Sequence, residues 1–146
     1  MIEVVDLTDT PAAEWDALAV RSPRGEALQS HAWGEFKAAA GWRPLRIRIE
    51  RDGAPIAVCS IQERDLASSV ARALPGDAGR HLGGLGRFLY APFGPVLLGE
   101  DPDGTLAGLR RFARRRHAAL LVVDPLWEEG GASAPALGHG GFSHAD

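Results

Sequence analysis

The sequence has little cysteine and no long apolar run, and each absence excludes a class of protein. A single cysteine, Cys59, excludes an internal disulfide and any metal site built from several thiolates. Cys59 lies in an apolar, strand-like stretch, which indicates a buried and unreactive thiol. No apolar segment reaches the ~18 residues of a membrane-spanning helix, and the acidic N-terminus is unlike a signal peptide. We therefore expect a cytoplasmic protein.

Lysine is almost absent as well. Lys37 is the one lysine among 16 basic side chains, in a composition rich in Ala, Gly and Arg that indicates a bias toward arginine codons. An ammonium is a compact point charge, and a planar guanidinium does not replace it in a tight phosphate site. Lys37 is therefore a candidate anion ligand, with a solvated surface lysine as the alternative. The net charge of −3 argues against a protein devoted to binding nucleic acid.

Two helices are predicted near the N-terminus, after a short strand that follows Met1. Thr10 followed by Pro11 is typical of a helix N-cap and first helical position. Ser30 is suited to cap a second helix over 31–40, and Gly41 is suited to end it. The apolar residues of this second helix, at i, i+3 and i+7, are Trp33, Phe36 and Ala40.

A β-hairpin is the clearest local prediction. Apolar and charged residues alternate strictly from Leu45 to Glu50, which predicts a strand with one buried face. Asp52-Gly53 predicts a tight turn, so that 43–63 forms an antiparallel pair.

The second half predicts a mobile loop, two strands around a helix, and a tail. The loop, rich in Gly, Ala and Arg, covers 65–85, and the Gly-rich tail covers 128–146 with a turn of helix near 134–137. Between them we expect a strand at 87–90, a helix from Asp103 or Thr105 to Ala113, and a buried strand at 120–123. Helices alternating with a mainly antiparallel sheet give an α/β (α+β) sandwich.

Two segments carry motifs that are more specific than the order of elements. Leu28–Lys37 reads LQSHAWGEFK and is followed by Gly41-Trp42, while Tyr90–Val96 reads YAPFGPV. The first resembles the hydrophobic-Gln-Ser, Trp-Gly-x-x-Lys and Gly-Trp pattern of the FemABX-type aminoacyltransferases, which form peptidoglycan interpeptide bridges. The second resembles the Tyr-x-Pro-x-Gly-Pro-Val pattern of the same family.

The resemblance implies a GNAT-like acyltransferase fold, with a mainly antiparallel mixed sheet flanked by helices. It also implies that 1–146 is one GNAT-like domain, the N-terminal half of a longer enzyme with a second such domain, or else a truncated relative. Enzymes of this family take an amino acid from aminoacyl-tRNA, with no further cofactor. They add it to the stem-peptide amine of a nucleotide- or lipid-linked muropeptide.

Two substrate-binding residues follow from the resemblance, Trp33 is a third candidate because it lies beside one of them, and no catalytic residue is identified. Lys37 matches the lysine that binds the phosphates of the muropeptide, and Tyr90 matches a tyrosine that lines the same cleft. Trp33 lies one helical turn before Lys37, where it would keep that helix face rigid, with core packing as its alternative. Phe93 stands where the family often has arginine, so an anion contact made by that arginine would be missing here.

Other charged groups indicate less. The basic run from Arg110 to His117 lies on a predicted helix, where a solvated face is favoured over contact with tRNA phosphates. The Gly-rich stretch 80–86 resembles a pyrophosphate loop for acetyl-coenzyme A, but it precedes a strand where that loop opens a helix. An exposed acidic loop is expected for Asp124, Glu128 and Glu129, and the histidines, at 31, 81, 117, 139 and 144, lack metal-ligand spacing.

Three functions remain open at this point. The first is an aminoacyltransferase domain of peptidoglycan precursor synthesis. The second is a GNAT-type N-acyltransferase that uses an acyl-coenzyme A, and it requires a coenzyme-binding strand, loop and helix. The third is a non-catalytic, partner-binding domain, which would keep the fold and have no affinity for muropeptide.

Overall fold

A six-stranded sheet forms the middle layer of the computed structural model, which describes residues 1–68, 85–128, 131 and 133–143. The strands follow the order β1-β2-β3-β4-β6, and β5 pairs with β3. All pairs are antiparallel except β4 with β6. The bounds of the strands are β1 Ile2–Asp6, β2 Arg43–Arg51, β3 Ala54–Asp65, β4 Arg87–Pro92, β5 Val96–Leu97 and β6 Ala118–Asp124.

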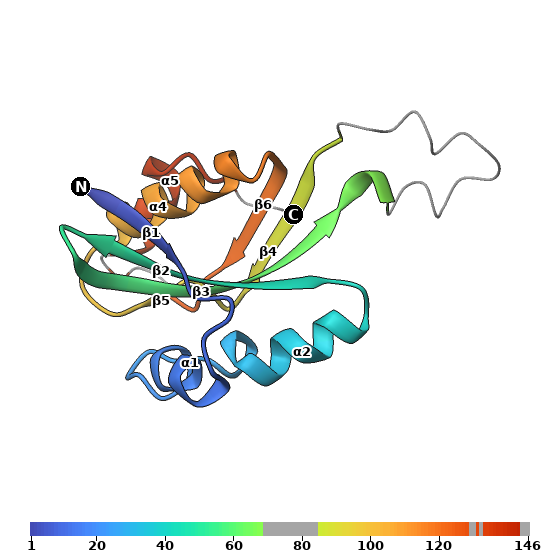
Figure 1. Ribbon diagram of the computed structural model, residues 1–146. Helices are drawn as coiled ribbons and strands as arrows, with labels where there is room; N and C mark the ends of the chain where they lie inside the picture. Colours follow the sequence, from blue (N-terminus) through green and yellow to red (C-terminus); the bar gives the residue numbers. More distant parts are fainter. Residues whose placement is uncertain (69–84, 129–130, 132, 144–146) are drawn as a thin grey trace.

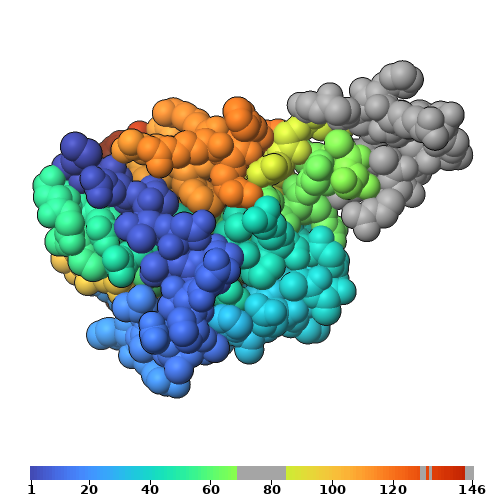
Figure 2. Space-filling model, viewed as in Figure 1, coloured from blue at the N-terminus to red at the C-terminus, as the bar shows by residue number. Residues whose placement is uncertain are grey.

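Helices cover both faces of the sheet. Figure 1 shows α1 and α2 below it and α4 and α5 above it, and Figure 2 shows the same two layers as blue-to-cyan and orange surfaces. The predicted mixed, mainly antiparallel sheet flanked by helices is therefore confirmed. Within the described residues, no helix is long and apolar enough to cross a membrane. The helices are α1 Ala12–Ala19, the 3-10 turn η1 Ala27–Gln29, α2 His31–Ala39, α4 Pro102–Arg115 and α5 Ala134–His139.

Several expectations concern residues outside the described ranges. Residues 69–84 of the predicted mobile loop over 65–85 lie outside the described residues. Most of the Gly-rich stretch 80–86 lies outside them as well. Glu129 and the end of the tail also lie outside the described residues. The predicted turn of helix in the tail is confirmed as α5.

Two apolar cores lie on the two faces of the sheet. The larger core packs β2, β3 and β4 against α4, and it includes Ile47, Ile49, Cys59, Leu89 and Leu109. Cys59 is fully buried, and burial raises the pKa of its thiol, which confirms the predicted inert cysteine. The smaller core lies between α1 and the sheet, and its members are Trp15, Ala19, Val58 and Val96.

The hairpin forms as predicted, but β2 is buried on both faces. Asp52 and Gly53 adopt φ values of 52° and 81°, which suit a tight turn between antiparallel strands. Arg46 is only 2% exposed and Glu50 only 8%, so the prediction of one buried face was wrong. At Arg46 the reason is that α2 packs over this end of the second face. Arg46 binds it there through hydrogen bonds to the carbonyl of His31 and the carboxylate of Glu35, at 3.3 and 3.1 Å.

The α2 helix begins and ends where the sequence predicts, but its apolar stripe is not buried. Ser30 is the N-cap, and its Oγ accepts a 3.1 Å hydrogen bond from the N–H of Trp33. Gly41 ends the helix with a φ of 83°. Phe36 is 64% exposed, because Gly34, and not the predicted stripe, faces the sheet. A Cβ at Gly34 would lie 2.9 Å from a guanidinium nitrogen of Arg46.

Three other details of the elements were predicted incorrectly. The N-cap of α1 is Pro11 and makes no side-chain cap bond, so Thr10 does not cap it. The α4 helix starts earlier than Asp103 or Thr105, because Asp101 caps it and Pro102 occupies its first turn. The strand at 120–123 is not buried, because β6 is an edge strand, and Leu120 is 52% exposed.

A buried amide holds the N-terminal layer to the sheet. Gln29 is fully buried, and its Nε2 donates to the carbonyls of Pro92 and Ser60 at 2.7 and 3.1 Å. Its Oε1 accepts from the N–H of Ser60 at 2.6 Å, and its own carbonyl accepts from the Trp15 indole at 2.7 Å. A Cβ on Gly94 would lie 2.6 Å from Gln29 Nε2, so the two sequence motifs contact each other here.

We predict that Gln29→Met destabilises the protein far more than Gln62→Met. Each buried polar group left without a partner costs about 1–3 kcal/mol, so Gln29→Met is expected to lower the free energy of unfolding by at least ~2 kcal/mol. Gln62 is equally buried but makes one 3.3 Å hydrogen bond, and its Oε1 has no partner among the described residues. Its substitution should cost less than ~1 kcal/mol. Urea unfolding measures both, and equal losses would contradict the role given to Gln29.

We also predict an acid-sensitive contribution from Asp101. Its hydrogen bond with Arg51 is the main cause that lowers the pKa of the carboxyl, and its cap bond to Gly104 lowers it further. A lowered pKa stabilises the fold above the ordinary value of about 3.9, and this stabilisation is lost as the pH falls below it. Asp101→Ala should therefore cost ~1 kcal/mol at pH 7 and progressively less in acid. A pH-independent difference in unfolding free energy would contradict this.

Candidate functional site

The site begins at the last turn of α2, where Lys37 lies over two indole rings. Its Nζ is 4.7 Å from the ring centroid of Trp42 and 5.9 Å from that of Trp33. The turn that ends the helix explains the first contact, because the N–H of Trp42 donates to the Lys37 carbonyl at 3.1 Å and folds the indole back. An ammonium over an aromatic face gains about 0.5–2 kcal/mol and keeps a defined position.

A row of aromatic rings continues from Trp42 along β4. The ring centroids of Trp42 and Phe88 are 5.7 Å apart, and those of Phe88 and Tyr90 are 6.5 Å apart with nearly parallel planes. Phe88 and Tyr90 are two residues apart in one strand and so point to the same face of the sheet. Trp33, the second indole that Lys37 contacts, packs against the exposed Phe36 with ring centroids 5.3 Å apart.

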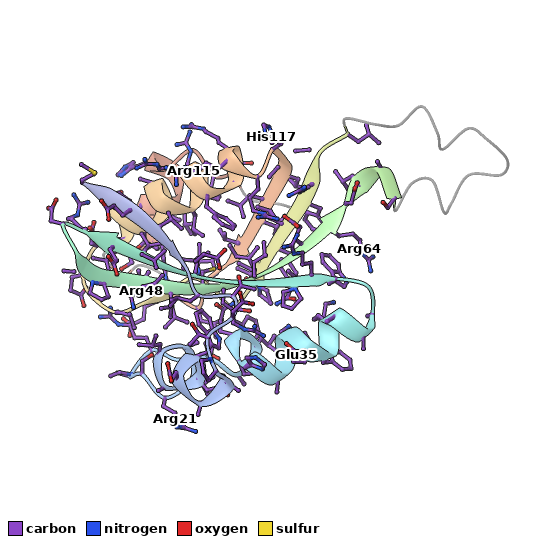
Figure 3. All side chains as sticks on the ribbon, viewed as in Figure 1. Arg21, Glu35, Arg48, Arg64, Arg115 and His117 are labelled. Carbon is purple, nitrogen blue, oxygen red and sulfur yellow. The ribbon has the colours of Figure 1, made fainter. Side chains whose placement is uncertain are left out.

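Arg64 is a second cation on Trp42. Its Cζ lies 4.4 Å from the centroid of the Trp42 ring, and its Nη2 donates to the carbonyl of Ala40 at 2.9 Å. The side chain comes from the end of β3, where Arg64 pairs with Phe88 of β4. Figure 3 shows Arg64 at the end of the sheet, just past the C-terminal end of α2.

The structure therefore joins two of the predicted residues directly and the third through other rings. Lys37 and Trp33 are in contact, while Tyr90 is reached through Trp42 and Phe88. Trp33 is half-buried and lies at the site, although its buried indole N–H has no hydrogen-bond partner among the described residues. The first motif already contains Trp42, but nothing local in the sequence marked Arg64 or Phe88.

Tyr90 contributes a neutral phenol to this row. Burial raises its pKa, and the negative charge of Asp124 raises it further. The phenol therefore stays protonated at neutral pH and is able to donate a hydrogen bond to an anionic oxygen. Asp124 ends β6 beside β4, where Pro92 pairs with it.

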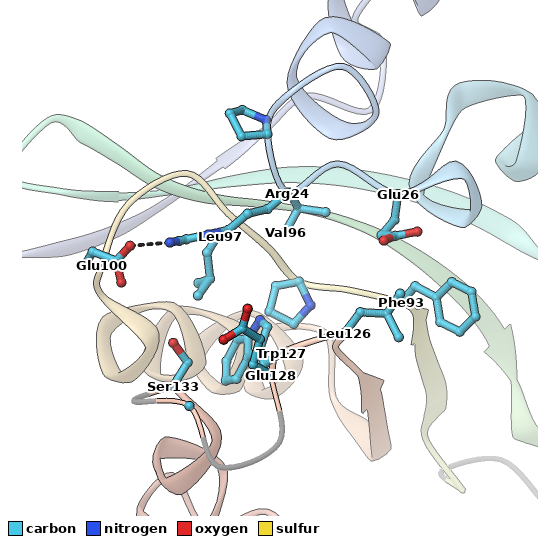
Figure 4. A pocket seen from close by; sticks show the side chains of 13 residues that line it. Arg24, Glu26, Phe93, Val96, Leu97, Glu100, Leu126, Trp127, Glu128 and Ser133 are labelled. Carbon is cyan, nitrogen blue, oxygen red and sulfur yellow. Dashed lines mark hydrogen bonds and ion pairs between the residues drawn. The ribbon is translucent and has the colours of Figure 1, made fainter.

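An acidic hollow of about 400 Å³ lies at the opposite, carboxyl ends of the parallel strands β4 and β6. Figure 4 shows that Glu26, Glu100 and Glu128 line it and that Arg24 makes an ion pair with Glu100. Phe93, with a φ of 52°, lines the same hollow, so this position adds no positive charge to it. Glu128 lines this hollow and is exposed, as Asp124 is, so the expected exposed acidic residues are confirmed at these two positions.

The N-terminus of α4, next to this hollow, is closed by its own residues. Asp101 accepts a 3.0 Å hydrogen bond from the N–H of Gly104, and its carbonyl accepts from the N–H of Thr105 at 3.1 Å. Pro102 has no N–H to offer. A helix N-terminus binds phosphate through free amide donors, so this one is poorly suited to a diphosphate.

The basic run on α4 is partly used within the domain. Arg110, Arg111 and Arg116 bond to the carbonyl of Gly140, the carbonyl of Ile2 and the carboxylate of Glu63. These contacts hold α4 to α5, β1 and β3. Within the described residues, which leave out His81 and His144, no group of three His, Cys, Asp or Glu side chains could hold a metal ion.

Comparisons with known proteins place the fold. No protein-family model matches the sequence, and no curated protein matches it closely. The structure is similar to that of FemX, with a TM-score of 0.68 and 23% identity over 97% of this chain and 32% of FemX. It is also similar to the aminoglycoside N-acetyltransferase AAC(6')-Iy in two complexes with coenzyme A or a coenzyme A-linked bisubstrate analogue. Those matches have TM-scores of 0.56 and 0.55, 14% and 15% identity, full coverage of this chain, and 93% and 90% coverage of the enzyme.

The fold is GNAT-like. The likeness to FemX confirms the fold that the FemABX-type motifs predicted. The chain spans about a third of the length of FemX. Both likenesses fall below 25% identity, so the chemistry of this GNAT-like domain has to be argued from its own residues.

We predict that the domain does not bind acetyl-coenzyme A. Asp101 and Pro102 leave the first turn of α4 few free amide donors, and the carboxylates of Glu100 and Asp103 repel a diphosphate there. Calorimetric titration measures this directly. Micromolar binding would contradict the prediction and favour an acyl-coenzyme A transferase.

Proposed function

We propose that this domain binds a phosphate-linked muropeptide for an aminoacyltransferase of peptidoglycan precursor synthesis. The amino acid would come from aminoacyl-tRNA, and the acceptor would be the stem-peptide amine. The observation that carries the proposal is the ammonium of Lys37, held at 4.7 Å over Trp42 at one end of a row of rings.

The geometry suits a ligand with an anionic group and a bulky uncharged part. Lys37 offers three N–H donors and a compact positive charge, which a diphosphate accepts well. The rings of Phe88 and Tyr90 offer a flat surface for stacking, and the Tyr90 phenol offers a donor beside it. Lys37 and the second motif are thus parts of one surface, as the FemABX resemblance implied.

The chemical step is placed outside this set of residues. Lys37, Trp33 and Tyr90 bind and orient, and none of them is proposed to accept the proton of the attacking amine. A second GNAT-like domain, in a longer protein, would complete the acceptor cleft and receive the aminoacyl-tRNA. We further propose that this protein works in the cytoplasm, where both substrates are soluble or reachable at the membrane surface.

We predict that Lys37→Ala weakens binding of a nucleotide-linked muropeptide to this chain by roughly tenfold to a hundredfold, the range expected for one charged hydrogen bond. In a longer enzyme the same change should raise KM for the muropeptide and spare tRNA binding. Fluorescence titration of the chain measures the first effect, and steady-state kinetics measures the second.

Two matched variants sharpen this test. Lys37→Arg keeps the charge but changes its shape, so it should bind with intermediate affinity. Arg21→Ala removes an exposed cation below α1, whereas Lys37 lies in the last turn of α2, so this variant should bind as the wild type does (Figure 3). Unchanged affinity in Lys37→Ala would contradict the proposal that Lys37 binds the phosphates of the muropeptide. No muropeptide binding by any variant, wild type included, would favour a non-catalytic, partner-binding domain.

A further inference from the structure

A second hollow, also of about 400 Å³, adjoins Trp42 at the end of the sheet that carries Arg64. It lies where β2 begins, β3 ends and β4 begins. Three arginines line it, Arg43, Arg64 and Arg87, together with the carboxylates of Glu63 and Asp65. The lining is therefore basic, in contrast to the acidic hollow at the other end of β4.

The Glu63 carboxylate is hydrogen-bonded by Arg116, so the nearby guanidiniums of Arg43 and Arg87 keep N–H donors that Glu63 does not use. Arg116 approaches this 6%-exposed carboxylate through two nitrogens and donates to Oε1 at 2.8 Å, and this contact raises the pKa of Arg116. Arg87 and Arg43 approach it only to 3.5 and 3.9 Å, beyond the about 2.7–3.2 Å of an N–H···O hydrogen bond. Arg116 thus satisfies Glu63, and the other two guanidiniums still face the hollow with donors to spare.

Arg64 connects this hollow to Lys37. One of its nitrogens is used on the Ala40 carbonyl, while its buried Nε has no hydrogen-bond partner among the described residues. Its Cζ lies 4.4 Å from the Trp42 centroid, and Lys37 Nζ lies 4.7 Å from the same centroid. The two cations therefore both lie against the same indole.

We propose that Arg64, assisted by Arg87, binds one phosphoryl group of the diphosphate whose other phosphoryl group lies against Lys37. This inference rests on the proposed function, because it gives the same ligand a second anchor. A diphosphate has two adjacent anionic centres, and a pair of cations around a single ring matches it better than either cation alone.

The test compares inorganic pyrophosphate with orthophosphate as probes for the 146-residue chain in 0.15 M salt. Two anchors should favour pyrophosphate by at least about tenfold, and Arg64→Met or Lys37→Ala should each weaken pyrophosphate roughly tenfold. Both changes should bring the ratio of the two affinities toward one. Arg64→Lys should recover part of the loss, and Arg21→Met, an exposed site below α1, should change nothing (Figure 3).

Each contrary result has a distinct meaning. Loss of pyrophosphate binding in Lys37→Ala but not in Arg64→Met overturns the second anchor and leaves the proposed function standing. Loss in Arg64→Met but not in Lys37→Ala overturns the shared site and the role of Lys37 together. Absence of any pyrophosphate preference in the wild type overturns the inference, while muropeptide titration still tests the proposed function.

A second variant protects the test against misfolding. Arg64 packs on Trp42 and bonds to Ala40, so Arg64→Met is checked by circular dichroism before titration. The Arg87 side chain is 43% exposed and, among the described residues, makes only the long contact to Glu63, so Arg87→Met is expected to fold. It should weaken pyrophosphate in the same direction, and unchanged affinity in this folded variant would overturn the part given to Arg87.

Discussion

The buried amide of Gln29 is the contact on which the rest of the site depends. It joins the segment before α2 to the middle of β3 and to the end of β4, and it uses both its donor and acceptor atoms. Because Ser30 follows directly and caps α2, this anchor sets where the helix starts. Lys37 then lies two turns later, over Trp42. A motif that resembles a substrate-binding signature therefore serves largely to pack the domain, and Lys37 at its far end is the residue proposed to contact the ligand.

Local chemistry made much of the fold predictable from the sequence. The Asp52-Gly53 turn, the Ser30 cap and the Gly41 terminator depend on residues within a few positions, and each appears where it was expected. The resemblance added the GNAT-like fold with a mainly antiparallel mixed sheet, whereas the parallel pairing of β4 with β6 was not predicted, because no local pattern indicates it. The turn and the two helix ends were predictable because their interacting residues are close together in the sequence.

The failures share a physical cause, which is contact between distant segments. The charged face of β2 was expected in solvent, yet α2 packs over one end of it and Arg46 is buried with its partners on that helix. The strand at 120–123 is apolar, yet it forms the edge of the described sheet and exposes Leu120. Arg64 joins the candidate site only because β3 pairs with β4, in a register that could not be predicted from the sequence.

The hollows at the two ends of the β3–β4 region differ in charge. The hollow beside Trp42 is lined by three arginines, whereas the hollow near α4 is lined by three glutamates and one paired arginine. An anionic ligand is attracted to the first and repelled from the second. The few free amides at the N-terminus of α4, and the lysine held over indoles, support the proposed anionic acceptor substrate over acyl-coenzyme A.

The indole N–H signals of the four tryptophans offer the most direct test of this account. Trp33 and Trp42 contact Lys37, Trp127 lines the acidic hollow, and Trp15 is buried in the smaller core. In a ¹⁵N-labelled chain titrated with a nucleotide-linked muropeptide, we expect the Trp33 and Trp42 signals to shift while the other two stay in place. A shift of Trp127 alone would place the ligand in the acidic hollow and contradict the central claim.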